Sequence, residues 1–310
     1  VCIIDDVITD GASKILPYQV CQERGLHTRA LVVLVDRQQG WQDTFKKKKI
    51  SMPVWAGMTL HDVRRHLIQR GTLQRCDSEQ EKKNQLIVAL DGMSWEQILS
   101  VVTVLRPTGC IFKVNDFLVE KGLEWLLPNL SAYGRVMVDL KHHDIPNTVA
   151  NTCNRIRKYN PWAVTVHASG GMKMIQAAVE AFRGTDTKVL GVTVLTSFDE
   201  TNCELVYGKG VSVTDQVSNL ANIALSSDAH GLVCSPQELE MLRKKYPDVT
   251  IVTPGIRAEA DLHDQARVMT PAEALKKGAN HIVMGRPITE APDPIAAAQE
   301  VVKDYYTSIA

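Results

Sequence analysis

From residue 86 onward, short apolar runs of strand length alternate with amphipathic stretches of helical length. The runs are nearly continuous in apolar residues, which indicates strands buried on both faces and therefore a parallel sheet. Eight β/α units within about 220 residues are typical of a (β/α)8 barrel. The strands are expected at 86–91, 110–114, 135–140, 163–168, 189–196, 230–235, 250–255 and 281–285.

An open, doubly wound sheet is the structural alternative to a closed barrel. It would need fewer strands, and its first turn is usually rich in glycine. The first turn of this repeat, LDGMSW at 90–95, lacks that pattern. The pattern therefore favours an α/β fold with a TIM barrel over residues 86–308.

A shorter α/β unit precedes the barrel at residues 1–75, and the polar stretch 76–85 is the predicted linker. Within the unit, strands are expected at 1–7 and 30–36 and helices at 13–24 and 59–71. Because the chain opens with a valine inside a strand-like run, we expect a fragment that lacks an N-terminal part.

Composition excludes some classes of partner. The formal net charge is +0 and the isoelectric point is about 7.2, so no global basic surface is available for nucleic acid or an anionic membrane. The lysines at 46–49 are interpreted as a solvated run. No apolar run approaches the roughly 20 residues of a membrane span, and no signal peptide is visible. Scattered cysteines, odd in number, indicate reduced thiols in a cytoplasmic protein.

Charged residues gather at the ends of the first three predicted barrel strands, where barrel active sites lie. Asp91 ends the first strand and Lys113 lies at the end of the second. Asp139 and Lys141 flank the end of the third, and Asp144 lies in the loop after it. Strand residues two apart share a face, so Asp139 and Lys141 should both point into the barrel mouth. Buried charges need partners, which an alternating Lys-Asp-Lys-Asp array supplies.

Such an array suits decarboxylation. A carboxylate repels the substrate carboxylate beside it, whereas an ammonium stabilises the carbanion left by carbon dioxide and then donates a proton. Because the contribution of ground-state repulsion is contested, the interpretation rests on the lysine. No grouping of histidine, cysteine and carboxylate indicates a metal, since the adjacent His142 and His143 should face opposite ways. His167 lacks a motif partner and is interpreted as a packing residue.

The segment DLKHHDIPNT at 139–148 resembles the signature of the bacterial type of orotidine 5′-monophosphate decarboxylase. HASGG, GVTVLTS, GLVCS, TPGIR and MGRPIT follow in the order of that family. The resemblance implies decarboxylation of orotidine 5′-monophosphate to UMP in pyrimidine biosynthesis, without metal or cofactor. It implies that Lys141 is the proton donor, that Asp139 lies beside the scissile carboxylate and that Lys113 holds the ribose and the charge network.

The same resemblance implies a further set of substrate-binding and partner-facing residues. Asp144 would act across the interface of a homodimer, with Thr148 near it. The others would contact the nucleotide: Asp91 the ribose, Thr196 and Ser197 the pyrimidine, Pro254 the base, and Gly285 with Arg286 the 5′-phosphate at the start of the last helix. Barrel phosphate sites do follow strands seven and eight, and a guanidinium matches phosphate geometry.

Two positions depart from the family pattern. The family usually has a phosphate-binding glutamine after TPGIR, whereas this chain has Ala258-Glu259-Ala260 in a shorter loop. The turn after Lys113 is Val114-Asn115, where glycine is common. A carboxylate at 259 repels phosphate unless it is turned away, so these departures should affect affinity and rate more than fold.

The segment VCIIDDVITDGAS at 1–13 resembles the phosphoribosyl pyrophosphate motif of type I phosphoribosyltransferases. LVVLVDRQQG and GMTLHDVRRHL resemble the C-terminal part of orotate phosphoribosyltransferase, which is fused to the decarboxylase in UMP synthases. The resemblance implies a partial unit in which Asp5 and Asp6 contact ribose and a loop containing Thr9, Gly11 and Ser13 holds phosphate. Asp10 departs from the motif. With half of the transferase expected to be missing, no transferase activity is expected.

Two alternatives stay open. A metal-dependent sugar-phosphate decarboxylase or aldolase of the same suprafamily uses a similar array, and magnesium dependence would discriminate it. A non-catalytic barrel would bind UMP without decarboxylation. Glu259 and Asp10 favour that second alternative, whereas the intact Lys-Asp-Lys-Asp array disfavours it.

Overall fold

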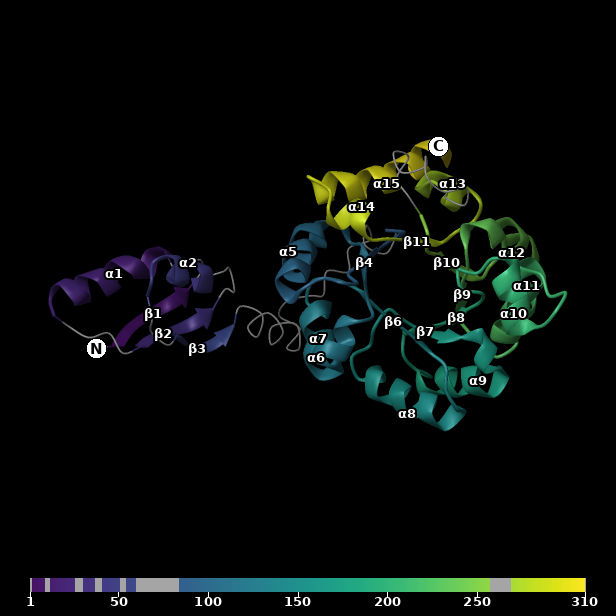
Figure 1. Cartoon of the computed structure of the whole chain (residues 1–310), viewed down its shortest axis with the longest axis horizontal. Coiled ribbons are helices and arrows are strands. Elements are labelled where there is room, and N and C mark those ends of the chain that lie inside the picture. Colours follow the sequence, from purple (N-terminus) through teal and green to yellow (C-terminus); the bar gives the residue numbers. More distant parts are fainter. Residues whose placement is uncertain are drawn as a thin grey trace. The chain divides into compact units, whose positions relative to one another are not determined.

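The structure is a computed structural model that describes residues 2–8, 12–25, 30–36, 41–50, 54–59, 84–256 and 269–309. The chain divides into two compact units, residues 1–75 and 76–310. Figure 1 shows the helices and strands of both units.

In its described residues, the first unit has a parallel sheet of three strands in the order β1-β2-β3 and two helices. Leu31 and Phe45 form its buried apolar contact. Its elements are β1 (Cys2–Ile8), α1 (Ala12–Glu23), β2 (Ala30–Asp36), α2 (Trp41–Lys47) and β3 (Val54–Thr59).

In this unit, the two predicted strands and the helix at 13–24 are confirmed, and the lysines at 46–49 are exposed as expected. The helix predicted at 59–71 is wrong at its start, because Thr59 ends β3. Pairing with β2 holds residues 54–59 extended, although the Ala-Gly pair in this segment has low strand propensity. Residues 60–71 lie outside the described residues.

The second unit is a closed barrel of parallel strands, as predicted, in the order β10-β11-β4-β5-β6-β7-β8-β9. Each predicted strand is present, and all except β5 and β6 end earlier than expected, where the loops of the barrel mouth begin. The strands are β4 (Leu86–Ala89), β5 (Ile111–Val114), β6 (Val136–His142), β7 (Ala163–His167), β8 (Lys188–Val192), β9 (Gly231–Val233), β10 (Thr250–Thr253) and β11 (His281–Met284).

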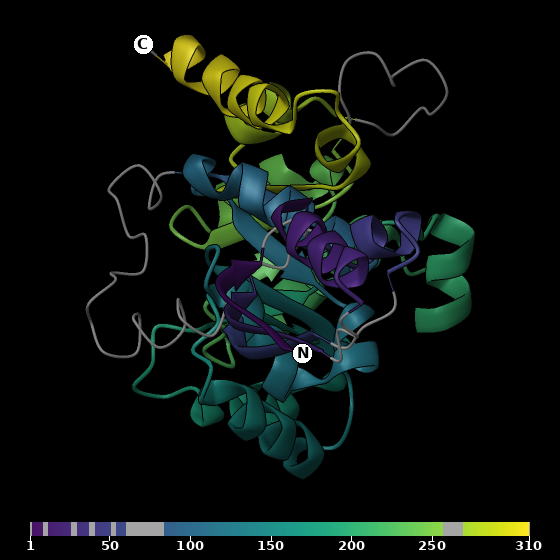
Figure 2. The same ribbon diagram turned by 90° about the vertical axis from the view of Figure 1, so that its left-hand side faces the viewer.

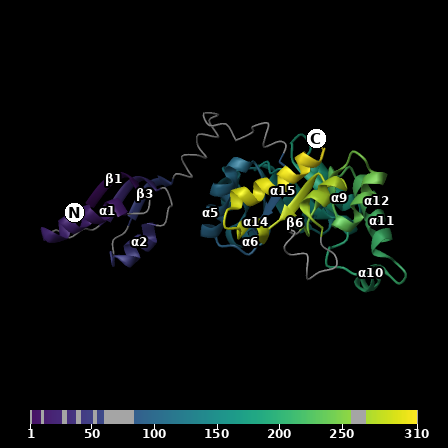
Figure 3. The same cartoon turned by 90° about the horizontal axis from the view of Figure 1, so that it is seen from above.

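Helices surround the barrel strands in chain order, as Figure 1 shows, and Figure 3 shows the same barrel from its side. The C-terminal helix α15 lies beside α13 (Figure 2). In the part of the chain that the structure describes, no helix has the length and apolar character needed to cross a bilayer. The helices are α5 (Trp95–Leu105), α6 (Phe117–Lys121), α7 (Leu123–Ser131), α8 (Pro146–Arg157), α9 (Met172–Ala181), α10 (Glu200–Tyr207), α11 (Val213–Leu225), α12 (Leu239–Lys245), α13 (Pro271–Lys276), α14 (Arg286–Thr289) and α15 (Pro294–Ile309).

Alternating strand residues build two apolar layers. One row, which includes Ile111 and Met137, packs inside the barrel. The other row, which includes Phe112 and Val138, packs against the helices. Because side chains along a strand alternate between faces, the residues that follow the inner row toward the carboxyl ends continue inward. This alternation carries polar side chains to the mouth of the barrel.

Candidate active site

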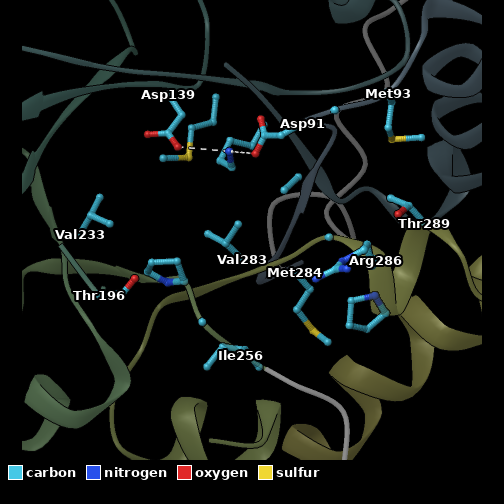
Figure 4. A pocket seen from close by; sticks show the side chains of 18 of the residues that line it. Asp91, Met93, Asp139, Thr196, Val233, Ile256, Val283, Met284, Arg286 and Thr289 are labelled. Carbon is cyan, nitrogen blue, oxygen red and sulfur yellow. Dashed lines mark hydrogen bonds and ion pairs between the residues drawn. The ribbon is translucent and has the colours of Figure 1, made fainter. Parts of the chain in front are cut away.

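A cavity of about 830 Å³ opens at the carboxyl ends of the barrel strands. Figure 4 shows Asp91 and Asp139 in one part of its wall and Arg286 with Thr289 in another. The predicted site residues that line it are Asp91, Lys113, Asp139, Lys141, Thr196, Pro254, Gly285 and Arg286. The structure therefore brings these eight predicted residues together around one cavity at the carboxyl end of the barrel.

Four charged side chains form a continuous array in this cavity. Lys113 Nζ lies 2.5 Å from Asp91 Oδ2 and 3.2 Å from Asp139 Oδ2. Lys141 Nζ lies 2.8 Å from the same oxygen of Asp139. The Lys113 and Asp139 side chains are 9% and 8% exposed, whereas those of Lys141 and Asp91 are 32% and 41% exposed. The array thus has a buried centre and two ends that a ligand in the cavity can reach.

The charge balance of the array keeps Lys113 protonated. Burial alone would lower the pKa of Lys113, but the neighbouring carboxylates of Asp139 and Asp91 outweigh burial and raise it above its ordinary value. Lys113 is therefore an ammonium at neutral pH and compensates the buried Asp139 carboxylate. The second ammonium, that of Lys141, is the more accessible and is placed to act on a bound molecule.

The backbone brings Asp139 and Lys141 together in a way that simple alternation does not describe. The β6–β7 register shifts between Val138 and His142, which marks a bulge, and Lys141 has a φ of 47°. The expected meeting of the two side chains is confirmed. A bulge, rather than regular pleating, shapes the strand between them. Asp91 likewise lies in the turn after β4 rather than in the strand.

Asp144, Thr148 and Ser197 do not line the cavity of their own chain. All three are exposed. Asp144 lies between β6 and α8, where its carboxylate accepts a hydrogen bond from the Ile145 N–H at 2.6 Å. Thr148 belongs to the first turn of α8. The structure thus separates these predicted residues from the charged array.

Gly285 and Arg286 lie directly after β11, on a part of the wall formed by α14. Arg286 is the first residue of this short helix. The prediction that the phosphate site begins the last helix is wrong in this detail, because α15 starts later, at Pro294. A short extra helix after the eighth strand is a frequent phosphate-binding feature of barrels. Glu259 lies outside the described residues.

Sequence reasoning followed the charged residues and missed the apolar floor of the cavity. Met137, Val192, Val233 and Val283 line the cavity and belong to the inner apolar layer. Extending the inward alternation along each strand would have found them. Of the Val114-Asn115 pair predicted to form the turn after Lys113, Val114 instead ends β5 and packs in the outer apolar layer, so the turn begins at Asn115.

Sequence reasoning did not single out two further polar residues, one in the cavity wall and one beside the array. Cys234 lines the cavity, and burial raises the pKa of its thiol, which keeps it neutral. Thr165 is fully buried beside Asp139 and bonds to it at 2.9 Å. No charge or motif marks a threonine in an apolar run as part of a site, so only the barrel register reveals it.

The histidines near the mouth pack against each other. The rings of His143 and His167 have centroids 5.4 Å apart, and burial lowers the pKa of His167. His143 is exposed whereas His142 is partly buried, as their adjacency predicted. Within the described residues, no group of three or more histidines, cysteines and carboxylates is arranged to hold a metal ion.

A closed parallel barrel with a paired charge array at the carboxyl ends of its strands has the architecture of a barrel enzyme. Residues 84–301 match the model of the orotidine 5′-phosphate decarboxylase / HUMPS family. The chain belongs to this family.

Curated relatives match the barrel part of the chain over nearly their whole length. A protein of Neisseria meningitidis serogroup C named orotidine 5′-phosphate decarboxylase is 42% identical over 227 residues, which cover 71% of this chain and 92% of the relative. A protein of Nitrosococcus oceani with the same name is 41% identical over 225 residues, covering 71% of this chain and 97% of the relative. The barrel therefore corresponds to nearly the whole of each relative.

Solved structures agree with the barrel assignment. The orotidine 5′-phosphate decarboxylase of Lactobacillus acidophilus superposes with a TM-score of 0.63 at 35% identity, covering 72% of this chain and 99% of that chain. The enzyme of that name from Pyrococcus horikoshii gives a TM-score of 0.59 at 21% identity, covering 71% and 99%. The second likeness shows the fold alone.

Proposed function

We propose that the barrel decarboxylates orotidine 5′-monophosphate to UMP in pyrimidine biosynthesis, without a metal or organic cofactor. The observation that carries the proposal is the pair of ammonium groups, from Lys113 and Lys141, on one oxygen of Asp139 in a member of this family. Both carboxylate oxygens of Asp139 already have partners, since Oδ1 accepts from the Thr165 hydroxyl and Oδ2 pairs with the Lys141 ammonium. The proposal therefore needs no added cation to compensate this carboxylate.

In the proposed reaction, Asp139 lies beside the substrate carboxylate and Lys141 faces the carbon that carries it. The bond to the carboxylate breaks, carbon dioxide leaves, and the electron pair stays on the ring carbon. The Lys141 ammonium stabilises this carbanion and transfers a proton to it, which yields UMP and a neutral amine. Lys113 stays paired with the Asp139 carboxylate, which its Nζ approaches to 3.2 Å.

The remaining cavity residues position the nucleotide in this proposal. Arg286 and the Gly285 backbone bind the 5′-phosphate, since a guanidinium offers two parallel N–H donors to phosphate oxygens. Asp91 and Lys113 contact the ribose. Thr196 and Pro254 flank the pyrimidine together with Ser197, whose exposed side chain approaches the ring once substrate is bound.

Asp144 and Thr148 support a second part of the proposal, a homodimer. They lie near Ile145, which is 66% exposed, and none of the three lines the cavity of its own chain. We propose that this surface packs against a second copy and delivers Asp144 to the partner's cavity. The expected mass in solution is that of a dimer, and Asp144→Ala should lower turnover while the fold is kept.

The role of the first unit stays a prediction. Asp5 and Asp6 lie in β1 and Ser13 lies in α1, whereas Thr9 and Gly11 are outside the described residues. We propose that this unit is related to type I phosphoribosyltransferases. Incubation of the protein with orotate and phosphoribosyl pyrophosphate should yield no nucleotide. The cytoplasmic location also stays a prediction.

The experiment that tests the main proposal mixes the purified chain with orotidine 5′-monophosphate in EDTA and follows the loss of orotate absorbance. Lys141→Ala is the control. Turnover that survives EDTA and vanishes in the variant supports the proposal. Turnover that requires magnesium would favour the metal-dependent alternative, and tight UMP binding without turnover would favour a non-catalytic barrel.

A further inference from the structure

Strand β6 bulges at the place where it carries the catalytic pair. The β6–β7 register leaves residues 139–141 opposite the single residue Thr165. Lys141 has a φ of 47°, in the left-handed region that residues other than glycine rarely adopt. Such a backbone persists only when its surroundings hold it, and a bulge removes ladder hydrogen bonds that would do so. The Lys141 N–H therefore needs a hydrogen-bond acceptor other than a strand carbonyl.

The Thr165 hydroxyl is that acceptor. The Lys141 N–H donates to Thr165 Oγ1 at 2.9 Å, and Oγ1 donates to Asp139 Oδ1 at 2.9 Å. A hydroxyl has one proton and two lone pairs, so it accepts from one residue and donates to the other at the same time. Thr165 is 0% exposed, which removes competition from water.

The two oxygens of Asp139 are thereby divided between different partners. Oδ2 faces the ammonium groups of Lys113 and Lys141, whereas Oδ1 faces the Thr165 hydroxyl. Contacts on both oxygens oppose rotation of the Asp139 carboxylate about the Cβ–Cγ bond. The same hydroxyl also holds the backbone from which the Lys141 side chain extends.

We propose that Thr165 is a positioning residue for the decarboxylation, which couples the orientation of the Asp139 carboxylate to the backbone of Lys141. This inference deepens the proposed function and rests on it. Thr165 is fully buried and does not line the cavity, so in this proposal it acts without direct contact with the substrate. Its effect passes through the two residues it holds, and a misplacement of about 1 Å in a catalytic pair costs roughly 100-fold in rate.

Thr165→Val tests the proposal, because valine keeps the shape of threonine and removes the hydroxyl. The variant leaves the Lys141 N–H without its acceptor and Asp139 Oδ1 without its donor. We expect kcat to fall by about 10- to 100-fold while KM and the Kd for UMP change by less than about threefold. Thr165→Ser, which keeps the hydroxyl, should restore most of kcat.

Thr193, the residue directly after β8, provides a matched control. Thr193 is also 0% exposed, and its hydroxyl donates to the Val233 backbone carbonyl at 3.1 Å rather than to the array. Thr193→Val should change kcat by less than about twofold at a comparable loss of thermal stability. If Thr165→Val does not fold, Thr165→Ser and Thr165→Cys form a second pair of similar size, and only the serine variant should retain kcat.

A readout that does not need turnover separates this inference from the proposed function. Hydrogen exchange of the Lys141 amide should be slow in the wild type and in Thr165→Ser and faster in Thr165→Val. A wild type without turnover refutes the proposed function. The exchange experiment then still shows whether the Thr165 hydroxyl holds the Lys141 backbone. Wild-type kcat in Thr165→Val, or equal exchange in all variants, overturns the inference.

Discussion

At the carboxyl end of the barrel, Lys113 and Lys141 lie against carboxylates, whereas at the amino end Lys188 lies against an aromatic ring. Lys188 Nζ is 5.5 Å from the centre of the Trp162 ring, and the His281 ring meets the same tryptophan edge-on at 4.8 Å. Arg135, at the same end, donates to a backbone carbonyl at 3.2 Å. The two ends thus stabilise cationic side chains with different partners.

The two environments shift pKa values in opposite directions. The pKa of Lys113 is raised, because carboxylates outweigh its burial. The pKa of Lys188 is lowered by burial and by the nearby Arg135 charge, and burial lowers the pKa of His281 to about 3. Ion pairs therefore preserve charge at the mouth, where it can act on a ligand, whereas burial opposes charge at the amino end, where side chains support the fold.

Removal of the exposed ammonium at the mouth should give the largest catalytic effect. Lys141→Ala should lower kcat by about 1,000-fold or more, since general acid–base groups contribute roughly 100- to 10,000-fold. Because Lys141 is partly exposed, the variant should stay folded. Steady-state kinetics and a thermal melt measure the two effects. Near wild-type turnover would show that the charged array at the mouth only supports the fold, as Lys188 and His281 are expected to do at the amino end.

Removal of the buried carboxylate should affect stability as well as activity. Asp139→Ala removes one of the two carboxylates that pair with the buried Lys113 ammonium and leaves only that of Asp91. Breaking a buried ion pair lowers the free energy of unfolding by about 3–5 kcal/mol. Urea titration measures this loss. The exposed Lys158–Glu124 pair is the control, and Glu124→Ala should leave the urea midpoint unchanged. Equal midpoints for both variants would contradict the distinction between buried and exposed pairs.

Removal of the guanidinium on the α14 side should mainly weaken binding. Arg286→Ala should raise KM about 10- to 100-fold, because a hydrogen bond to a charged group contributes about 1.5–3 kcal/mol. Arg286→Lys should recover part of the affinity but not the two-pronged contact. The decisive comparison uses orotidine without its phosphate, for which wild type and Arg286→Ala should behave alike. A large difference with orotidine would argue against a phosphate role.

A substitution at the amino end should change stability and leave catalysis alone. The native state keeps His281 neutral down to about pH 3, whereas the unfolded chain protonates it from about pH 6.5. The unfolded state thus binds more protons in this window, and the free energy of unfolding falls as pH falls, by up to about 1.4 kcal/mol per pH unit from this group. His281→Gln should flatten that slope between pH 6 and 4.

A buried residue without a titratable group provides the control for this effect. Thr187, just before β8 at the amino end, is 1% exposed and donates its hydroxyl to the Pro161 backbone carbonyl at 2.7 Å. Thr187→Val should keep the wild-type dependence of stability on pH, measured by urea titration at several pH values. Both variants should retain wild-type kcat at pH 7 if the amino end serves only the fold. Loss of turnover in His281→Gln with an intact fold would break the comparison between the two ends.

Several features of the site were predictable because they depend on local periodicity. The inward placement of Lys113 and Asp139 follows from alternation along β5 and β6. The roles of Thr165 and of the α14 turn were not predictable in this way. Thr165 is an ordinary residue of an apolar run, and its contact with Asp139 depends on the β6–β7 register, which involves residues 26 positions apart in the chain.

The sequence by itself determined the number and order of the barrel strands, the end of the barrel that carries charge, and the family to which the chain belongs. Tertiary structure decided that Lys141 adopts a left-handed backbone, that both ammonium groups share one oxygen of Asp139, and that Asp144 does not line the cavity of its own chain. The physical reason is the difference in sequence separation between the interacting residues. Strand and helix periodicity arises between neighbours in the chain, whereas hydrogen bonds and ion pairs depend on distances set by closure of the whole barrel.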